Sequence, residues 1–279
     1  MFANEVELRS SDAQSPSAGV SAAVESERSE LQEILVMANG AAIKFTSYQE
    51  SVTKLLELVK LPNELKKYDK IVLKPHLSTP ENSTPVDFTE SVLKFVLQNK
   101  NPIAEVFIVE GADGFQTFDL FEELKYKELA EKYSIGLIDL NNSETEEMQN
   151  GFFLKFQSID YPKILLESFV ITLPKLVENE EYDLQGSLST MLGAFPASHY
   201  KNFYSRIKNK IRKWPMKYSI HDINRCKLPN FSVIDASSKG RILAGLPIAI
   251  DKQAAKLLDQ DWRTVPHIRT IDENFQEKE

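Results

Sequence analysis

Short runs of β-favouring apolar residues alternate with longer stretches of helical periodicity through most of this 279-residue chain. The run at 70–75, KIVLKP, stops at a proline. The Thr-Pro-Val-Asp sequence at 84–87 then supplies an N-cap, a first-turn proline and an acid for the next helix. Strands that alternate with helices of about 10 to 15 residues indicate βαβ units. The sequence therefore predicts an α/β fold, with an open, mainly parallel sheet flanked by helices in a single large domain.

The individual elements follow from the spacing of the apolar residues, about two in strands and about 3.6 in helices. Strands are expected at 41–45, 70–75, 104–109, 135–140, 165–173, 231–236 and 242–250. Helices are expected at 47–59, 84–96, 118–133 and 200–217, and a last helix is expected from a cap at Asp251 to residue 259.

The two ends of the chain differ in composition from its middle. Residues 1–26 are rich in Ser, Ala and Glu, and a stretch with so few bulky apolar residues cannot offset its chain entropy by burial. We expect a disordered tail there. Apolar residues at helical spacing predict a short helix or linker at 27–40. The α/β domain then covers 41–260, and a polar C-terminal tail covers 261–279.

Composition excludes several classes of function. The formal net charge of -8 disfavours nonspecific nucleic-acid binding by the whole molecule. The chain has no run of about 18 apolar residues, so no membrane span is expected. The single cysteine, Cys226, excludes an intramolecular disulfide and fits a reducing, cytoplasmic compartment. The four histidines lack the spacing of a metal motif, so no metal site is predicted, and the sequence leaves any cofactor unknown.

Polar residues directly follow several of the predicted strands. In an open parallel sheet, ligands bind beyond the carboxyl ends of the strands, so these residues are candidates for a shared cleft. Strands also need polar residues to end, and that simpler explanation stays open. The candidate ligand-binding residues are Lys74, His76, Gly111, Lys175 and Asp235, and the candidate catalytic residues are Glu110, Asp113 and His199.

The charge of the chain changes sign between Leu184 and His221, where there are seven Lys or Arg residues and no Asp or Glu. Apolar residues within this segment step by three and four, which predicts an amphipathic helix at 200–217 with two basic flanks. Such a helix can be a solvated basic surface, or it can contact an anion, a polyphosphate or, as the weakest option, nucleic acid. The apolar residues concerned are Tyr200, Phe203, Ile207, Ile211 and Trp214.

The order of several motifs resembles the family described as domain of unknown function 362. The matching pieces are IVLKPHLS, STPVDFTESVLKFVL, AEVFIVEGADGF, FVITLPKL, MLGAFP with His199 after it, FSVIDA and AGLPIAIDKQAAKLL, which together span residues 41–258. The resemblance implies an α/β domain associated with redox and iron–sulfur proteins. Some members append a ferredoxin-like domain with cysteine clusters. This chain has no such cluster, so electron transfer would need a separate electron-transfer protein.

The chain departs from the family pattern at one putative pocket. Where the family tends to read PKLKTH, Val177 and Asn179 replace the second lysine and the histidine. Where a Lys-Asn pair often precedes the glycine of MLGAFP, this chain has Ser189 and Thr190. If the missing groups touch ligand in the family, the resemblance implies weaker anion binding here.

Two hypotheses follow from these observations. In the first, the domain binds a small anionic metabolite or a nucleotide-like cofactor, with charge supplied by Lys74 and Lys175. Glu110 or Asp113 would act as a base or contact a metal, and His199 would transfer a proton. In the second, the chain is a non-catalytic relative whose basic helix docks a protein partner. Whether the protein is an enzyme stays open at this point.

Overall fold

The computed structural model describes residues 34–37 and 39–276. The tail predicted at 1–26 lies outside the described residues, as does the first part of the short helix predicted at 27–40. Within that range Ile34–Met37 form a strand, β1, where the spacing predicts a helix. The compact unit described below begins at Val36.

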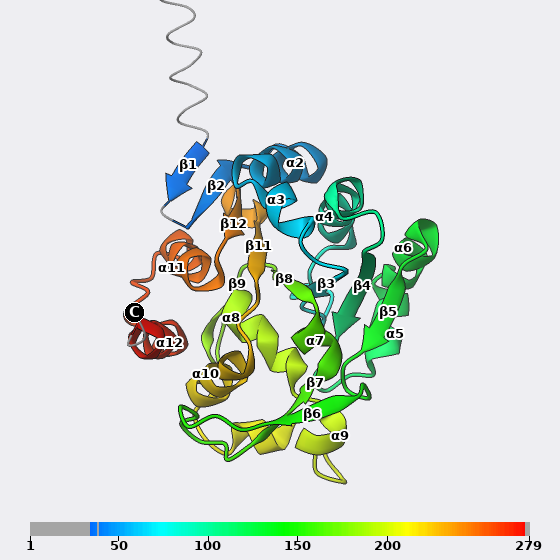
Figure 1. The fold of residues 1–279 in the computed structure, drawn as a ribbon. Coiled ribbons are helices and arrows are strands. Elements are labelled where there is room, and N and C mark those ends of the chain that lie inside the picture. The colour runs from blue at the N-terminus through cyan, green and yellow to red at the C-terminus, as the bar shows by residue number, and fades with distance from the viewer. Residues whose placement is uncertain (1–33, 38, 277–279) are drawn as a thin grey trace, which may run out of the picture. The chain divides into compact units, whose positions relative to one another are not determined.

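One sheet organises this unit. Its strands are β2 (Gly40–Lys44), β3 (Lys70–Pro75), β4 (Glu105–Glu110), β5 (Gly136–Asp139), β8 (Phe169–Leu173), β11 (Phe231–Ala236) and β12 (Arg241–Gly245). They lie in the order β2-β12-β11-β8-β3-β4-β5 (Figure 1). The strands from β11 to β5 are parallel to their neighbours, whereas β12 pairs antiparallel with both β11 and β2. The prediction of an open, mainly parallel sheet is therefore confirmed.

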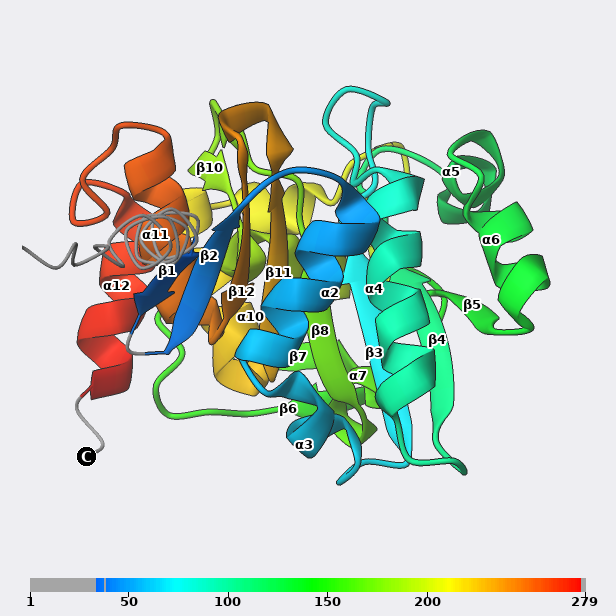
Figure 2. The ribbon, with the colours of Figure 1, turned by 90° about the horizontal axis from the view of Figure 1, so that it is seen from above.

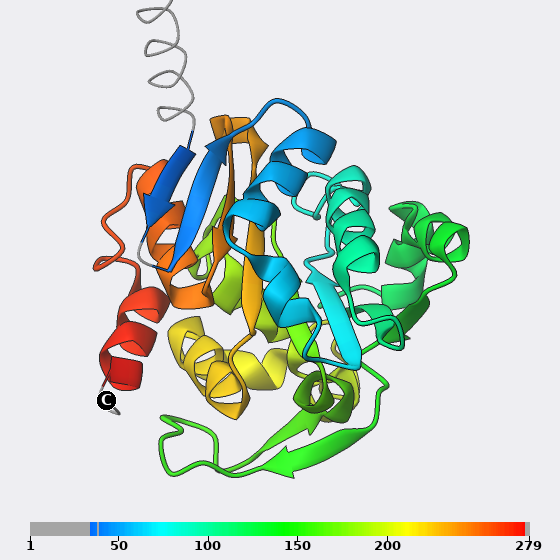
Figure 3. The same ribbon diagram turned by 45° about the horizontal axis from the view of Figure 1, so that its top comes forward.

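Helices cover both faces of this sheet. Figure 2 shows α2 (Tyr48–Leu58) and α4 (Val86–Asn99) on one face, where they pack against each other. On the other face α11 (Pro247–Leu257) packs against β11 and β12, and α8 (Ser187–Thr190) packs against β8 (Figure 3). None of the helices in the described part of the chain is both long and apolar enough to cross a membrane.

Shorter elements complete the unit around these layers. Two small antiparallel pairs lie outside the sheet, β6 (Thr145–Met148) with β7 (Ile159–Pro162) and β9 (Val177–Asn179) with β10 (Asp183–Gln185). The remaining helices and 3-10 turns are α3 (Leu61–Leu65), α5 (Thr117–Glu123), α6 (Tyr126–Tyr133), α7 (Lys163–Glu167), η1 (Met191–Ala194), α9 (Ala197–Tyr200), η2 (Asn209–Arg212), α10 (Met216–Cys226), η3 (Ser237–Lys239) and α12 (Pro266–Gln276).

The central strands are buried along their whole length. Every residue of β8 (FVITL) and of β11 (FSVIDA) is buried. Parallel strands that are covered by helices on both faces have this near-continuous apolar character. Two of their polar side chains have specific partners: the Thr172 hydroxyl bonds to that of Ser187, and the Asp235 carboxylate accepts from Tyr48.

Three predicted elements have different bounds in the structure. Residues 118–133 form two helices, α5 and α6, because Lys125 between them has a positive φ of 64°. The run at 165–173 is α7 followed by β8, and the run at 242–250 is β12 followed by the start of α11. Apolar spacing alone does not distinguish a short buried strand from a buried helix, which explains both errors.

Thr84 does not cap α4 as predicted. The helix begins at Val86, and the residue at its N-cap position is Pro85. The Thr84 hydroxyl instead donates to the Leu173 carbonyl at 2.5 Å and accepts the backbone N–H of His76 at 3.0 Å. Thr84 thus ties together the carboxyl ends of β3 and β8, which are neighbours in the sheet.

The helix predicted at 200–217 is wrong. α9 ends at Tyr200, η2 covers only Asn209–Arg212, and α10 begins at Met216, directly after a proline. A residue that precedes proline is disfavoured in the helical region, so a continuous helix would be broken there. Phe203 is 91% exposed, so the predicted apolar stripe does not form one buried face.

The C-terminal residues 261–279, predicted as a polar tail, contain α12. Ile268 and Ile271 of this helix are fully buried in the same core cluster as Ile250 of α11. Two apolar residues three apart are enough to define a buried face on an otherwise polar helix. Composition alone conceals such a face.

Asp251 lies inside α11 rather than at its cap. Its carboxylate reaches α8, where it accepts the backbone N–H of Ser187 at 2.7 Å and that of Leu188 at 2.9 Å. The side chain is fully buried, and this burial raises the pKa of Asp251 to about 7, against the opposing effect of the two hydrogen bonds. Asp251 therefore joins α11 to α8 through a group that titrates near neutral pH.

We predict that Asp251 makes the stability of the fold depend on pH. The unfolded carboxyl has a pKa of about 4, so between about pH 4 and pH 7 the folded state holds a proton that the unfolded state has lost. The contribution of Asp251 to the free energy of unfolding is fully present below about pH 4. It falls by up to about 4 kcal/mol as the pH rises through 7. In urea unfolding, Asp251→Asn should show a flatter dependence on pH than wild type. An exposed control, Asp261→Asn, should keep the wild-type slope, and equal slopes for all three proteins would contradict the prediction.

Candidate functional site

The carboxyl ends of β3 and β8 mark the point where the chain reverses its direction across the sheet. β3 leads to β4 on one side of it, whereas β8, its other neighbour, leads to β11 on the opposite side. The two connections separate and leave a crevice between the strand ends. In open α/β sheets, ligands bind at such a topological switch point. We therefore looked for side chains that converge there.

A cavity of about 200 Å³ lies at this point, and we call it the switch-point cavity. The loop after β3, the loop after β4, the β9–β10 hairpin and η1 each contribute to its wall. Its polar lining includes Glu110, Asp113, Glu181 and Arg212. Two of the predicted site residues, His76 and Gly111, also line it.

A buried ion pair lies behind the wall of this cavity. The Lys74 ammonium is 3.0 Å from a Glu110 carboxylate oxygen and donates to the Thr190 carbonyl at 2.7 Å. The other Glu110 oxygen accepts the Gly111 backbone N–H at 2.8 Å. Both side chains are at most 2% exposed, so burial lowers the pKa of Lys74 and raises the pKa of Glu110. Their mutual attraction opposes both changes.

Two glycines allow the loops to close over this pair. A Cβ atom at Gly193 would lie 2.3 Å from a Glu110 oxygen and 2.5 Å from the Lys74 nitrogen. A Cβ atom at Gly111 would lie 2.3 Å from the Gly193 carbonyl. Neither distance is compatible with a side chain, so glycine is required at both positions for the backbone to approach this closely.

Arg212 bridges two sides of the switch-point cavity. Its guanidinium lies 2.6 Å from the Asp113 carboxylate, on the loop after β4, and 2.7 Å from that of Glu181, on the β9–β10 hairpin. The Lys208 backbone N–H also donates to Asp113 at 2.7 Å. Arg212 is the one cation on the described lining of the cavity, and both carboxylates beside it are already engaged with it.

Lys208 is a buried lysine between the loop after β4 and η1. It is 1% exposed, and its ammonium donates to the Gly111 carbonyl at 2.7 Å. Burial lowers the pKa of Lys208 to about 8, although Glu110 and Asp113 favour its charged form. The lysine thus anchors the 201–212 segment to the carboxyl edge of the sheet. The segment makes this contact in place of the helix predicted there.

His76 is held neutral. Burial lowers its pKa to about 3, and the nearby charge of Lys74 acts in the same direction. Its imidazole makes no hydrogen bond to any residue that the structure describes. A neutral imidazole presents one donor and one acceptor, and here both are available to a ligand.

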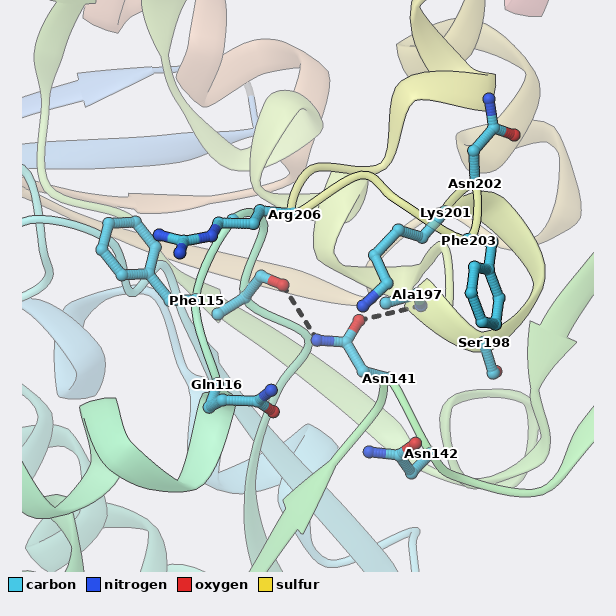
Figure 4. Close-up of a pocket in the computed structure, with 12 residues that line it drawn as sticks. Phe115, Gln116, Asn141, Asn142, Ala197, Ser198, Lys201, Asn202, Phe203 and Arg206 are labelled. Carbon is cyan, nitrogen blue, oxygen red and sulfur yellow. Dashed lines mark hydrogen bonds between the residues drawn. The ribbon is translucent and has the colours of Figure 1, made fainter.

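A second cavity, of about 780 Å³, lies on the other side of the loop after β4 (Figure 4). We call it the outer cavity. Its wall comes from that loop, from the residues that follow β5, from α9 and from the 201–206 segment. Ala112 lines both cavities. The polar and aromatic groups at the wall include Phe115, Gln116, Asn141, Lys201, Phe203 and Arg206.

Asn141 fixes the wall of the outer cavity. Its amide nitrogen donates to the Ala112 carbonyl at 2.8 Å and to the Thr117 hydroxyl at 3.1 Å, while its oxygen accepts the Ala197 N–H at 3.0 Å (Figure 4). These bonds join the loop after β4, the end of β5 and α9. The cavity wall is thus preorganised by one buried amide.

The outer cavity is lined by cations and contains no acid. In Figure 4 the Lys201 side chain extends toward Asn141, and the Arg206 side chain extends toward Phe115. Neither side chain forms an ion pair or hydrogen bond with a described residue. No Asp or Glu occurs among the described lining residues. In a chain with a net charge of -8, this cavity has a positive local field.

The structure brings together five of the eight candidate residues proposed from the sequence. Lys74, His76, Glu110, Gly111 and Asp113 all lie in or directly behind the wall of the switch-point cavity. β3 and β4 are parallel neighbours, so their carboxyl ends reach the same edge. This proximity supports a shared site but does not test the role of any single residue.

The other three candidate residues lie elsewhere. The exposed Lys175 ammonium donates to the Glu81 carbonyl, and the Asp235 carboxylate accepts the Tyr48 hydroxyl at 3.0 Å. His199 is 42% exposed and lies 3.0 Å from the Asp160 carboxylate, and it lines neither cavity. Neither Lys175 nor Asp235 lines the switch-point cavity, so the strand ends contribute to it only in part.

Sequence reasoning missed Asn141, Lys208 and the positions of Lys201 and Arg206. Asn141 follows β5 closely, so the strand-end argument already applied to it. The absence of acids from the segment pointed to its cations, but the predicted helix would have spread them over one regular surface.

No group of three His, Cys, Asp or Glu side chains suited to a metal occurs in the described part of the chain. Burial raises the pKa of the Cys226 thiol, which keeps it protonated.

Comparison with protein families gives one match. The family model described as domain of unknown function (DUF362) covers residues 71–241. The chain belongs to this family. The resemblance drawn from its motifs is thereby confirmed. The comparison with curated proteins gives no match.

Solved structures with a similar fold include lactate racemase apoprotein from Thermoanaerobacterium thermosaccharolyticum. The TM-score is 0.57 at 16% identity, and the alignment covers 78% of this chain and 56% of that one. A protein from Thermotoga maritima aligns with a TM-score of 0.43 at 14% identity, over 81% of this chain and 58% of that one. The DUF362 chain thus spans little more than half the length of either protein. At these identities the first likeness shows a shared fold.

We predict that the buried pair of Lys74 and Glu110 tolerates replacement only as a unit. Glu110→Gln leaves a buried ammonium without its counter-ion, which typically costs about 3–5 kcal/mol. A double variant, Lys74→Met with Glu110→Leu, removes both charges at similar volume and should recover most of that loss. Unfolding free energies measured in urea would decide this. A double variant less stable than Glu110→Gln would contradict the argument.

Proposed function

We propose that this DUF362 protein binds a small phosphate-bearing molecule, of nucleotide-like size, in the outer cavity. The carrying observation is the pair of unpaired cations, Lys201 and Arg206, on a cavity wall without any acid. Binding of an anion between these two cations would break no ion pair among the described residues. Such a ligand would meet attraction from two charges in a partly desolvated space.

The size and lining of the cavity support the same ligand class. Its volume of about 780 Å³ falls within the range of roughly 300–1,000 Å³ that is usual for small-molecule sites. The amides of Gln116 and Asn142 can hydrogen-bond to phosphate or sugar oxygens. The half-exposed ring of Phe115 and the almost fully exposed ring of Phe203 offer surfaces for an aromatic group. Together these groups fit the anionic metabolite or nucleotide-like cofactor expected from the sequence.

The comparisons are consistent with ligand binding without naming the ligand. The similar fold belongs to a protein named lactate racemase, a name that refers to lactate. The DUF362 description assigns no reaction. Our proposal therefore concerns binding, and it rests on the cations and the volume of the outer cavity.

Docking of a protein partner is a second candidate, favoured by one observation. Phe203 and Tyr204, at 91% and 96% exposed, form an edge-to-face ring pair on the same segment as Lys201 and Arg206. Exposed aromatic side chains beside cations suit an acidic protein surface, such as that of the separate electron-transfer protein implied by the family resemblance. If docking alone is correct, Phe203→Ala with Tyr204→Ala abolishes partner capture and phosphate ligands do not bind.

We predict that Lys201→Ala and Arg206→Ala each weaken binding of ATP or pyrophosphate by roughly tenfold or more. A charge-assisted hydrogen bond contributes about 1.5–3 kcal/mol, and about 1.4 kcal/mol corresponds to a factor of ten in affinity. Isothermal titration calorimetry at low ionic strength provides the measurement, and raising the salt concentration should weaken the wild-type affinity.

Lys213→Ala is the matched control for these variants. Lys213 is exposed and belongs to the same acid-free segment, but it lines neither cavity. Its replacement should leave the affinity unchanged. Equal affinity for wild type and both cavity variants, or no binding of either ligand to wild type, would rule out the proposal.

A further inference from the structure

We infer that the switch-point cavity is a second binding site, for a small uncharged compound that carries hydroxyl or carbonyl groups. Its ligand differs from that of the outer cavity in size and in charge. The volume of about 200 Å³ has room for roughly seven water-sized groups, at about 30 Å³ each. That space is too small for a nucleotide and suits a compound of three or four carbon atoms, by the same rough count.

The charges at the switch-point cavity disfavour an anion. Its described lining contains one cation, Arg212, and that cation already lies against the Asp113 and Glu181 carboxylates. A phosphate would have to displace one of these partners and would then lie beside the displaced carboxylate. The nearby Lys74 is likewise paired, with Glu110. An uncharged ligand avoids each of these penalties.

Several polar groups of the lining have no hydrogen-bond partner among the described residues. Three of them are the imidazole of His76, the amide nitrogen of Asn179 and the hydroxyl of Tyr182. The Asn179 oxygen accepts the backbone N–H groups of Glu181 and Tyr182, at 2.8 and 3.1 Å, which fixes the amide orientation. The amide nitrogen, a donor, is therefore the end that remains for a ligand.

These three groups remain uncharged around neutral pH. Burial keeps His76 in its neutral form, and burial together with nearby carboxylates raises the pKa of Tyr182 so that it keeps its proton. Together they present donors and acceptors within one small volume. Hydroxyl and carbonyl oxygens match that set, because they accept from the donors and a hydroxyl also donates to the imidazole.

The two cavities are separate sites. Ala112 is their one shared lining residue among those described, and the loop after β4 runs between them. The cations of the outer cavity do not line the switch-point cavity. This inference therefore stands independently of phosphate binding, and substitution at Lys201 and Arg206 should leave it untouched.

Dihydroxyacetone is the probe we choose to test the switch-point cavity, with lactate and inorganic phosphate as anionic comparisons. Ligand-observed NMR titration of the full chain should give saturable binding of dihydroxyacetone. Tyr182→Phe and Asn179→Ala should each raise its Kd by roughly tenfold, which is the loss of about 1.4 kcal/mol for one hydrogen bond. Lactate and phosphate should bind at least tenfold more weakly to this site.

Nitrogen-15 NMR of the histidine rings supplies a second readout. The His76 resonances should report a neutral ring at pH 5 and should shift when dihydroxyacetone is added. Asn142→Ala in the outer cavity is the matched control and should bind the probe like wild type. Unchanged His76 resonances, equal Kd values for Tyr182→Phe and wild type, or tighter binding of lactate or phosphate at this site would each overturn the inference.

The experiment distinguishes the two proposals. Lys201→Ala with Arg206→Ala should bind dihydroxyacetone like wild type while losing ATP, and Tyr182→Phe should show the opposite pattern. If Asn179→Ala fails to fold, Tyr182→Phe still decides the outcome, because it removes only a hydroxyl group. Loss of dihydroxyacetone binding in the Lys201 and Arg206 variant would show one joint site and would overturn the inference of two.

Discussion

The buried pair of Lys74 and Glu110 holds the carboxyl edge of the sheet together. Lys74 is the penultimate residue of β3 and Glu110 is the last residue of β4, and their bonds reach the Thr190 carbonyl and the Gly111 N–H. The pair therefore fixes two strand ends, the end of α8 and the start of the loop after β4. A buried ion pair seldom adds much net stability compared with an apolar pair, so its value here lies in positioning these loops. Both cavities depend on that loop for one of their walls.

The 201–212 segment distributes charge between the two cavities. Its buried Lys208 bonds to the Gly111 carbonyl, and Arg212 pairs with acids at the switch-point cavity. Lys201 and Arg206 have no such partners and line the outer cavity. One acid-free segment thus provides a paired cation to the switch-point cavity, where acids outnumber cations in the described lining. It also provides the two cations of the outer cavity, whose described lining holds no acid. Irregular backbone suits this role, because a helix would present its cations on a regular surface.

The sequence predicted the sheet and one half of the site for a physical reason. Parallel neighbours end at the same edge, so polar residues near the ends of KIVLKP and EVFIVE had to meet, as Lys74 and Glu110 do. Asp235 also ends a strand, yet its side chain bonds to Tyr48 on α2, because strand side chains alternate between faces. Spacing by three and four predicted a helix at 200–217, but tertiary contacts such as that of Lys208 decided its conformation. A sequence pattern does not show such long-range contacts.

The departures of this chain from its family pattern coincide with the switch-point cavity. Val177 and Asn179, which stand where the motif tends to have a lysine and a histidine, both line it. A lysine at 177 would add a positive charge to the lining and would make the cavity more attractive to anions. With valine there, the carboxylates of Asp113 and Glu181 are matched to Arg212 alone. Asn179 keeps a hydrogen-bond donor where a histidine would titrate. The substitutions therefore remove positive charge from the lining of the switch-point cavity while they preserve part of its polar character, which is consistent with the uncharged ligand that we infer for it.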